Sequence, residues 1–352
     1  MKTYMVTGGA GFIGSNFILH MLSKYKDITI INVDKLTYAG NLENLESAKE
    51  DKRHIFVQAD ICDKEIITSL FEKYPIDYVV NFAAESHVDR SIKDPDVFAK
   101  TNVMGTLNML DCARTTWQTG EDSFKEGVKY LQVSTDEVYG ALGPTGYFTE
   151  TTPLDPHSPY SASKASADMF VKAYGDTFKM PINITRCSNN YGPYQFPEKL
   201  IPLIINNCLS HKRLPVYGDG LQVRDWLYVL DHCKAIDLVL HKGKIGQIYN
   251  IGGHNEKPNI VIINSIINYI HDTVDDRVSD KLIEHITDRK GHDRRYGIDP
   301  KKIDDELGWK PETRFDEGIK LTIDWYLENK EWMEHVTSGI YQSYYEKMYS
   351  GR

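Results

Sequence analysis

The first 135 residues alternate between short apolar runs and longer stretches in which apolar residues recur with helical spacing. Within residues 13–25, for example, Phe17, Met21 and Leu22 share one helical face. Helices are predicted at 13–25, 64–73 and 97–114, and strands at 4–6, 28–33, 54–58, 78–82 and 130–133. Continuous apolar strands alternating with helices indicate a parallel sheet that is covered on both faces. With right-handed crossovers, the pattern predicts an α/β fold with a doubly wound parallel sheet of the Rossmann type.

The pattern changes beyond about Cys187, where segments rich in Asn, Gly, Pro and Tyr interrupt helical stretches. Residues 248–251 have the apolar pattern of a strand that rejoins a sheet. We therefore predict a dinucleotide-binding domain over 1–187, to which segments near 225–252 return, and a smaller C-terminal α/β substrate lobe over 188–352.

The composition narrows the classes of partner. The chain has 352 residues, of which 41% are hydrophobic and 26% charged, as in a globular protein of two domains or lobes. The 41 Lys and Arg against 50 Asp and Glu give a net charge of −9, which argues against nucleic acid and anionic membranes as partners. No apolar run is long enough for a membrane span, and the first residues have the pattern of a strand rather than a signal peptide. The five scattered cysteines lack CxxC spacing, so we expect no metal site and a cytoplasmic protein with reduced thiols.

A glycine-rich segment, TGGAGFIG at residues 7–14, follows the first strand and opens the first helix. It contains GxGxxG through Gly9, Gly11 and Gly14, and GxxGxxG through Gly8, Gly11 and Gly14. Glycines at these positions permit a tight turn and let the backbone approach a diphosphate, which then lies at the N-terminus of the helix. The segment predicts a dinucleotide site.

An acidic residue at the end of the second strand indicates which dinucleotide binds. Asp34 lies twenty positions after Gly14, where a carboxylate can accept the ribose hydroxyls of adenosine and repel a 2′-phosphate. NAD is therefore favoured over NADP, although the neighbouring Lys35 could accept such a phosphate. The alternative is a structural turn followed by a surface aspartate. Residues after the third and fourth strands lie where the adenine and nicotinamide halves must run: Asp60, Ile61, Ala83, Ala84 and Ser86.

Two further motifs carry candidate catalytic groups. Thr135, Asp136 and Glu137 follow the fifth strand, and ligands of such sheets lie beyond the carboxyl ends of the strands. Tyr160 and Lys164 are four residues apart on a predicted helix, so the hydroxyl and the ammonium can converge. A nearby cation lowers the pKa of a tyrosine, which predicts Tyr160 as the base for a substrate hydroxyl. The alternative for Asp136 and Glu137 is a solvated acidic turn without a catalytic role. The alternative for Tyr160 and Lys164 is a pair of residues on the surface of a helix.

These motifs together resemble the extended short-chain dehydrogenase/reductase family, whose members act on nucleotide sugars with tightly held NAD. Within that family the chain is similar to the nucleotide-sugar 4,6-dehydratases over nearly its whole length. The supporting stretches are DKLTYAGNLENL, AAESHVDRSI, STDEVYG, PYSASKASAD, NNYGPYQFPEKLIP, YGDGLQVRDW and KGHDRRYGID. The resemblance implies conversion of dTDP-glucose to dTDP-4-keto-6-deoxyglucose, for rhamnose-type deoxysugar biosynthesis. In that reaction C4 is oxidised, water leaves across C5–C6, and the hydride returns to C6.

The adjacent carboxyl groups of Asp136 and Glu137 favour this reaction over epimerisation. An epimerase only removes and returns a hydride at one carbon, whereas elimination needs one group to take the C5 proton and another to protonate the departing hydroxyl. The residues alone do not tell the acid from the base. The resemblance implies that Asp136 is the acid, Glu137 the base, and Thr135 a hydrogen-bond partner of the C4 oxygen. An NAD-dependent nucleotide-sugar 4-epimerase and a non-catalytic NAD-binding regulatory protein are the alternatives.

The resemblance also implies two sets of ligand contacts. The residues expected around NAD are Gly8, Gly11, Phe12, Ile13, Gly14, Asp34, Lys35, Leu36, Thr37, Asp60, Ile61, Ala83, Ala84, Ser86, Thr101, Tyr160, Lys164 and Asn189. The residues expected around the nucleotide-diphosphate sugar are Ser86, His87, Thr135, Asn190, Glu198, Lys199, Leu200, Pro215, Tyr217, Arg224, Asn259, Arg289, Asp293 and Tyr296. Among these, Arg224 and Arg289 can offer paired hydrogen bonds to a diphosphate. Lys290 stands where the family pattern has proline, and the nucleobase stays open between dTDP, UDP and CDP.

The helices predicted near 96–114 and 160–178 carry apolar residues on more than one face. In the first helix, Val97, Val103, Met104, Leu107, Met109 and Leu110 exceed what one sheet-facing stripe requires. We therefore expect a homodimer formed through these helices, as in the family. The alternative is that the second lobe covers these apolar residues.

Overall fold

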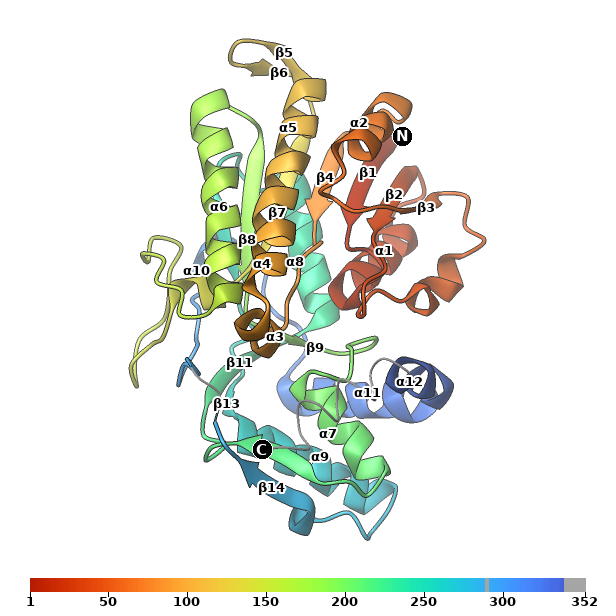
Figure 1. Ribbon diagram of the computed structural model, residues 1–352, viewed down its shortest axis with the longest axis vertical. Coiled ribbons are helices and arrows are strands. Elements are labelled where there is room, and N and C mark those ends of the chain that lie inside the picture. The colour runs from red at the N-terminus through yellow and green to blue at the C-terminus, as the bar shows by residue number, and fades with distance from the viewer. Residues whose placement is uncertain (289–290, 339–352) are drawn as a thin grey trace.

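The computed structural model describes residues 1–288 and 291–338, and a seven-stranded parallel sheet forms its centre (Figure 1). In spatial order the strands are β12 (Ile248–Ile251), β8 (Ile182–Cys187), β7 (Lys129–Thr135), β4 (Tyr78–Asn81), β1 (Lys2–Thr7), β2 (Ile28–Asp34) and β3 (His54–Gln58). Every neighbouring pair is parallel. The strand order reverses between β1 and β4, and a ligand crevice forms at such a point. The predicted α/β doubly wound fold is confirmed.

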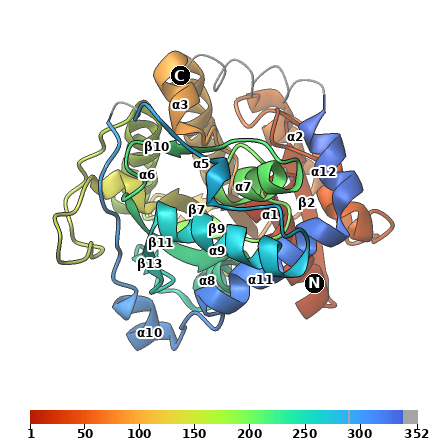
Figure 2. The same ribbon diagram turned by 90° about the horizontal axis from the view of Figure 1, so that it is seen from below.

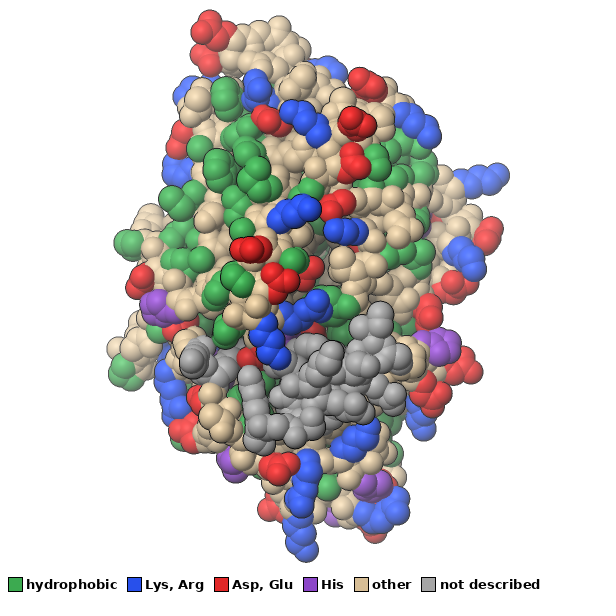
Figure 3. Space-filling model, in the orientation of Figure 1, with side chains coloured by type: hydrophobic (Ala, Val, Ile, Leu, Met, Phe, Trp, Pro, Cys, Tyr) green, Lys and Arg blue, Asp and Glu red, His purple; other side chains and the backbone are tan. Residues whose placement is uncertain are grey.

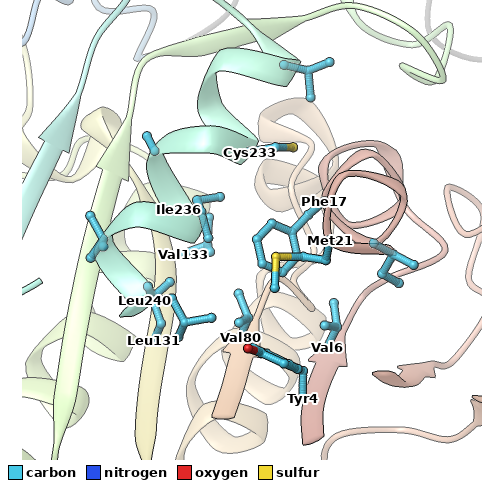
Figure 4. Close-up of a cluster of buried hydrophobic side chains, with 14 of the residues drawn as sticks. Tyr4, Val6, Phe17, Met21, Val80, Leu131, Val133, Cys233, Ile236 and Leu240 are labelled. Carbon is cyan, nitrogen blue, oxygen red and sulfur yellow. The ribbon is translucent and has the colours of Figure 1, made fainter. Parts of the chain in front are cut away.

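Helices cover both faces of this sheet, as the continuous apolar strands require. On one face lie α1 (Phe12–Lys24) and α8 (Val229–Lys242). Figure 4 shows Phe17 of α1 and Ile236 of α8 packing over Val80 and Leu131 of the sheet. The opposite face is covered by α2 (Lys64–Lys73), α5 (Thr106–Trp117) and α6 (Pro159–Phe178). The two apolar layers leave the carboxyl ends of the strands as the place for a site.

The helix predicted over 97–114 is longer and has a changed hydrogen-bond pattern in its middle. It runs as α4 (Pro95–Phe98), the π-helical η2 (Ala99–Gly105) and then α5. At Gly105, a Cβ would lie 2.5 Å from Ile61 Cδ1, so the helix passes close to the segment after β3. π-Helical turns often occur at functional sites, and η2 carries Thr101, one of the residues expected around the cofactor.

A smaller lobe lies below the sheet in Figure 1 and faces the viewer in Figure 2. Its core is formed by α7 (Leu200–Leu209), α9 (Asn259–Thr273), α11 (Phe315–Glu328) and α12 (Lys330–Thr337). It also contains the sheet β9 (Asn189–Tyr191), β11 (Val223–Tyr228) and β13 (Glu256–Pro258), and the pair β10 (Leu214–Tyr217) and β14 (Ile283–Ile286). The predicted smaller C-terminal α/β lobe is therefore present.

Short elements complete the described part of the chain. They are η1 (Leu42–Ala48), α3 (Val88–Lys93), β5 (Gln118–Gly120), β6 (Ser123–Phe124), η3 (Asp136–Tyr139), η4 (Asp280–Leu282) and α10 (Lys301–Leu307). Helix α10 packs beside β12, and its Ile303 joins the core under α1 and α8. A late segment therefore packs on the large sheet, as α8 and β12 do, whereas β11 belongs to the sheet of the smaller lobe. Within the described residues, none of the helices is both long and apolar enough to cross a membrane.

Candidate active site

The glycine turn between β1 and α1 has the shape of a diphosphate cradle. Gly8 has a φ of +68°, and a Cβ there would lie 2.7 Å from the backbone nitrogen of Ala83. A Cβ at Gly14 would overlap the Gly8 carbonyl oxygen, so the helix packs against the turn backbone to backbone. A Cβ at Gly11 would meet only that oxygen, at 3.3 Å, because the turn opens there. Gly11 is the N-cap of α1, no side chain caps the helix, and its first turn has no acidic residue. These residues fit the diphosphate of a dinucleotide.

Asp34 lies beside this turn, at the end of β2. Its two carboxylate oxygens accept hydrogen bonds from the backbone nitrogens of Ala10 (2.9 Å) and Leu36 (2.8 Å), and burial raises its pKa. The Lys35 ammonium donates to Asp60 at 2.7 Å. Although burial opposes the change, this bond lowers the pKa of Asp60. Because Asp60 already balances the charge of Lys35, the surroundings of Asp34 favour NAD over a dinucleotide with a 2′-phosphate.

A cavity of about 340 Å³ runs along the carboxyl ends of the strands. It is lined by nearly every residue that the sequence places around NAD: Gly8, Gly11, Phe12, Ile13, Gly14, Asp34, Lys35, Thr37, Asp60, Ile61, Ala83, Ala84, Ser86, Thr101, Tyr160, Lys164 and Asn189. Leu36 is the exception, because its backbone nitrogen turns toward Asp34 and its φ is +56°. Ser86, Thr135, Asn190, Glu198 and Lys199 of the expected substrate set line the same cavity, together with Asp136 and Glu137.

The turn after β7 places its two carboxyl groups in different environments. Thr135 is the N-cap of η3, where its hydroxyl oxygen accepts a hydrogen bond from the Glu137 nitrogen at 3.3 Å. Asp136 is 1% exposed, and its Oδ2 has no hydrogen-bond partner among the described residues. Burial, with the charges of Glu137 and Asp225, raises the pKa of Asp136 well above its ordinary value. Glu137 is only partly buried. This asymmetry favours the protonated form of Asp136, which is the form that a general acid requires.

Helix α6 brings Tyr160 and Lys164 to the same cavity, and a reciprocal capping box between Ser158 and Ser161 fixes its start. The Lys164 ammonium donates to the carbonyl oxygen of Val133 at 2.7 Å, and burial lowers the pKa of Lys164. Burial, with the charge of Glu137, raises the pKa of Tyr160. The sequence-based expectation of a lowered tyrosine pKa is therefore wrong for this structure. The reason is that desolvation of the phenol dominates, while the ammonium is bound to a backbone carbonyl.

Arg224 lies next to the acidic pair without lining the cavity. Its guanidinium stacks on the ring of Tyr296 at 4.1 Å and donates to the carbonyl oxygen of Asp293 at 2.9 Å. The Tyr296 hydroxyl donates to the Asp293 carboxylate at 2.7 Å. Burial and the charge of Glu137 raise the pKa of Tyr296, while the charge of Arg224 lowers that of Asp136. The predicted residues Arg224, Asp293 and Tyr296 thus form one cluster beside Asp136 and Glu137.

Glu198 and Lys199 join the loops of the two lobes over the cavity. Glu198 is buried, which raises its pKa, and it accepts a hydrogen bond from the Tyr38 hydroxyl at 2.9 Å. The Lys199 ammonium donates to the carbonyl oxygen of Ser86 at 2.9 Å. His87 does not line the cavity, but its ring approaches the Glu198 carboxylate to 4.0 Å. These contacts place both residues where a ligand could span the lobes.

The other predicted substrate residues lie farther out in the small lobe. Leu200 begins α7, and Pro215 and Tyr217 belong to β10, where the Tyr217 hydroxyl donates to Asp89 of α3 at 3.3 Å. Asn259 begins α9, and its buried Oδ1 has no hydrogen-bond partner among the described residues. None of these four lines the cavity. Arg289 and Lys290 lie outside the described residues.

Comparison with known proteins agrees with this geometry. The family model described as GDP-mannose 4,6 dehydratase matches residues 5–322. A dTDP-glucose 4,6-dehydratase of Xanthomonas campestris pv. campestris (strain B100) is 52% identical over 345 residues, which cover 97% of this chain and 98% of that protein.

This chain belongs to the dTDP-glucose 4,6-dehydratase family.

Solved structures of the dTDP-glucose 4,6-dehydratase family have the same fold. The enzyme of Bacillus anthracis, in complex with NAD, has a TM-score of 0.86 and 48% identity, covering 96% of this chain and all of that one. The enzyme of Streptomyces venezuelae, with NAD and a second ligand bound, has a TM-score of 0.87 and 44% identity, covering 95% and 99% of the two chains.

The sequence did not indicate the following residues of the cavity wall: Val33, Ala39, Gly40, Ala59, Phe82, Val97, Val133, Cys187, Ser188, Gln195 and Phe196. Four of them, Ala59, Phe82, Cys187 and Ser188, are the last residue of a parallel strand or the next one, so for these the strand end itself was the available signal. Asn102 was also missed. It is buried in η2, and its amide donates to the Glu85 carbonyl oxygen (3.0 Å) and to the Ser163 hydroxyl (2.8 Å). It therefore braces the loop after β4 against α6, a role that no local pattern indicates.

Proposed function

We propose that this protein removes water from dTDP-glucose and forms dTDP-4-keto-6-deoxyglucose, with NAD as a cofactor that it retains. The observation that carries the proposal is the pair of adjacent carboxyl groups in unequal environments, Asp136 buried and Glu137 partly exposed, in one cavity with Tyr160. Relatives named dTDP-glucose 4,6-dehydratase, which are about 50% identical to this chain over nearly its full length, support the reaction. Neighbouring structures in complex with NAD support the cofactor.

The turn of Gly8, Gly11 and Gly14 would hold the cofactor diphosphate, and Asp34 the adenosine ribose. When bound, NAD supplies the means to take a hydride from C4 of the sugar and to return one to C6. Tyr160 takes the proton of the C4 hydroxyl, and Thr135 positions the C4 oxygen. To accept this proton Tyr160 must be a phenolate, and the positive charge of Lys164 four residues further along α6 favours that form.

Elimination uses the acidic pair. With C4 oxidised to a carbonyl, the C5 proton becomes acidic, and Glu137 removes it. Burial beside two other carboxyl groups raises the pKa of Asp136 and favours its protonated form, and Asp136 donates this proton to the C6 hydroxyl as water leaves. An epimerase needs neither step, so this pair separates the two activities.

The reaction is tested by NMR of the product formed from dTDP-glucose in deuterated water. We expect deuterium at C5 of a 4-keto-6-deoxy sugar, and a galactose product without deuterium would contradict the proposal. In Glu137→Gln, reduced nicotinamide should accumulate while water loss is blocked. Glu121→Gln, at an exposed position between β5 and β6, is the control and should leave turnover unchanged. Normal turnover by Glu137→Gln would refute the role of Glu137. Parallel assays with UDP- and CDP-glucose decide the nucleobase.

We also propose a homodimer. Large apolar side chains on α3, α4, η2 and α6 are more than a third exposed: Ile92, Val97, Met104, Met169 and Phe170. Figure 3 shows hydrophobic side chains gathered over α5 and α6. Met109 and Leu110, which the sequence suggested for the interface, are instead fully buried in the core under α5. The family resemblance favours a second copy of this chain as the partner that covers these side chains. Sedimentation of the protein in solution measures whether it is a dimer.

We assign NAD to residues 1–187 and the sugar nucleotide mainly to 188–352, as the sequence predicts. The five free cysteines support a reducing compartment, the cytoplasm.

A further inference from the structure

Ala10, in the middle of the glycine turn, is held through both its backbone nitrogen and its carbonyl oxygen. Its nitrogen donates to Asp34 at 2.9 Å. Its carbonyl oxygen accepts hydrogen bonds from the backbone nitrogen of Asn41 (2.9 Å) and from the side-chain amide of Asn44 (3.0 Å). Glycine backbone has the greatest conformational freedom, and Ala10 has glycine on both sides. The partners of Ala10 therefore help the turn to keep its shape, together with the hydrogen bonds from the Gly8 nitrogen to the Val33 carbonyl oxygen (2.8 Å) and from the Gly11 nitrogen to the Gly8 carbonyl oxygen (3.2 Å).

Asn44 connects the carbonyl group of Ala10 to Trp332, which lies far along the chain. Asn44 is 1% exposed in η1, and its Oδ1 accepts a hydrogen bond from the Trp332 indole nitrogen at 2.8 Å. An indole N–H can only donate and a backbone carbonyl can only accept, so the side-chain amide of Asn44 satisfies both in one orientation. We call this series of bonds the Trp332–Asn44–Ala10 relay. It joins residues that are 288 positions apart along its first link.

Trp332 belongs to α12, which lies beside the N-terminal segments drawn in red and orange in Figures 1 and 2. Its ring packs against Trp325 of α11 at 5.2 Å and against Tyr194 at 6.1 Å. The residue before Tyr194 contacts the cofactor helix as well, because the side-chain amide of Asn16 donates to the Pro193 carbonyl oxygen at 3.0 Å. The aromatic cluster of the small lobe is thus docked on the turn and helix that cradle the diphosphate.

We propose that Trp332 is a positioning residue for the dinucleotide, and that docking of α12 through the relay controls how tightly the cofactor is retained. The inference rests on the proposed NAD-dependent function. A reaction that takes a hydride and returns it in the same cycle needs the cofactor to stay bound between the two steps. A polar link from the small lobe to the turn makes that retention depend on the lobe that holds the sugar nucleotide.

The test compares Trp332→Phe, which keeps an aromatic ring and removes the indole N–H, with Trp325→Phe. Trp325 belongs to the same cluster, but no bond from its indole nitrogen to the turn exists among the described residues. The Kd and dissociation rate of NAD are measured on cofactor-stripped protein, with the thermal stability of the stripped form alongside. We expect Trp332→Phe to bind NAD about tenfold more weakly, the effect of one buried hydrogen bond. Excess NAD should restore its kcat, whereas Trp325→Phe should bind NAD normally.

Asn44→Ala breaks the relay from the other side and serves if Trp332→Phe does not fold. The double variant should bind NAD no more weakly than Asn44→Ala alone, because Trp332 acts through Asn44. The relay would be overturned if the losses of NAD affinity from the two single substitutions added in the double variant. It would also be overturned if Trp325→Phe weakened NAD binding as much as Trp332→Phe does. If the natural protein binds NAD and turns over dTDP-glucose, but the Kd of Trp332→Phe for NAD is within twofold of the natural value, only this inference fails. If the natural protein binds no NAD, the proposed function fails with it.

Discussion

Asp136 imposes a stability cost at neutral pH that the substitution Asp136→Asn should remove. The carboxyl group is 1% exposed, and burial is the largest cause of its raised pKa, followed by the charges of Glu137 and Asp225. The folded protein therefore holds this proton at pH values where the unfolded chain has released it. Asparagine has a similar shape and does not titrate, so it avoids the cost of keeping a carboxyl group protonated.

The sign and size follow from linkage. The unfolded group titrates near pH 3.8, and the folded group titrates well above that value. Below the unfolded pKa both states are protonated, so there is no cost. Above it, the folded state binds the extra proton, and stability falls by about 1.4 kcal/mol for each pH unit until the folded pKa is reached. Over the three units to pH 7 the upper bound is about 4 kcal/mol. The charge of Arg224 and the hydrogen bond from Thr135 reduce it, because both lower the pKa of Asp136.

The assay is urea unfolding of cofactor-free protein at pH 5, 6, 7 and 8 for the natural protein, for Asp136→Asn and for Asp122→Asn. Asp122 is exposed between β5 and β6, so its variant should follow the natural protein at every pH. Asp136→Asn should lose dehydratase activity and gain stability over the natural protein as pH rises. A difference in unfolding free energy that stays constant from pH 5 to 8 would refute the reasoning, because an uncoupled packing change has no pH dependence.

Four further outcomes follow from the same site. Gly11→Ala should keep the fold, with a melting temperature near that of the natural protein, but lose NAD binding in calorimetry, because its methyl group enters the cradle. Gly14→Ala should lower the melting temperature as well, since its Cβ overlaps the Gly8 carbonyl oxygen, and equal melting temperatures for the two variants would contradict this assignment. Asp34→Ser should weaken NAD binding at least tenfold and narrow the preference for NAD over NADP, because it removes both a charge and the acceptor for Ala10. Burial raises the pKa of Cys187 to about 12, so its labelling by a thiol reagent at pH 8 should be slow in the native protein and fast after denaturation, and fast native labelling would contradict its burial.

The short-range features of this protein were readable from the sequence because they depend on neighbours a few residues apart. Continuous apolar runs predicted six of the seven strands of the central sheet, all except β8, and apolar residues at helical spacing predicted α1, α2, α5 and α6. The Gly8–Gly14 turn carries its own conformational requirements. The middle of the long helix was not predicted as π-helical, and its Gly105 packs against Ile61, which is 44 positions away in the sequence. The adjacency of Asp136 and Glu137 was visible, but not which of them keeps a proton.

That decision belongs to the tertiary structure. A pKa depends on burial and on charges from other elements, and Asp225, which helps to hold the proton on Asp136, is 89 positions away in the sequence. The same holds for Lys164, whose partner proved to be the carbonyl oxygen of Val133, and for Trp332, whose partner Asn44 lies near the other end of the chain. The sequence by itself determined the fold class, the dinucleotide turn and the residue types of the proposed catalytic pair, because these are set by local spacing. Only the tertiary structure decided protonation and long-range positioning, because both arise from desolvation and from contacts that folding creates.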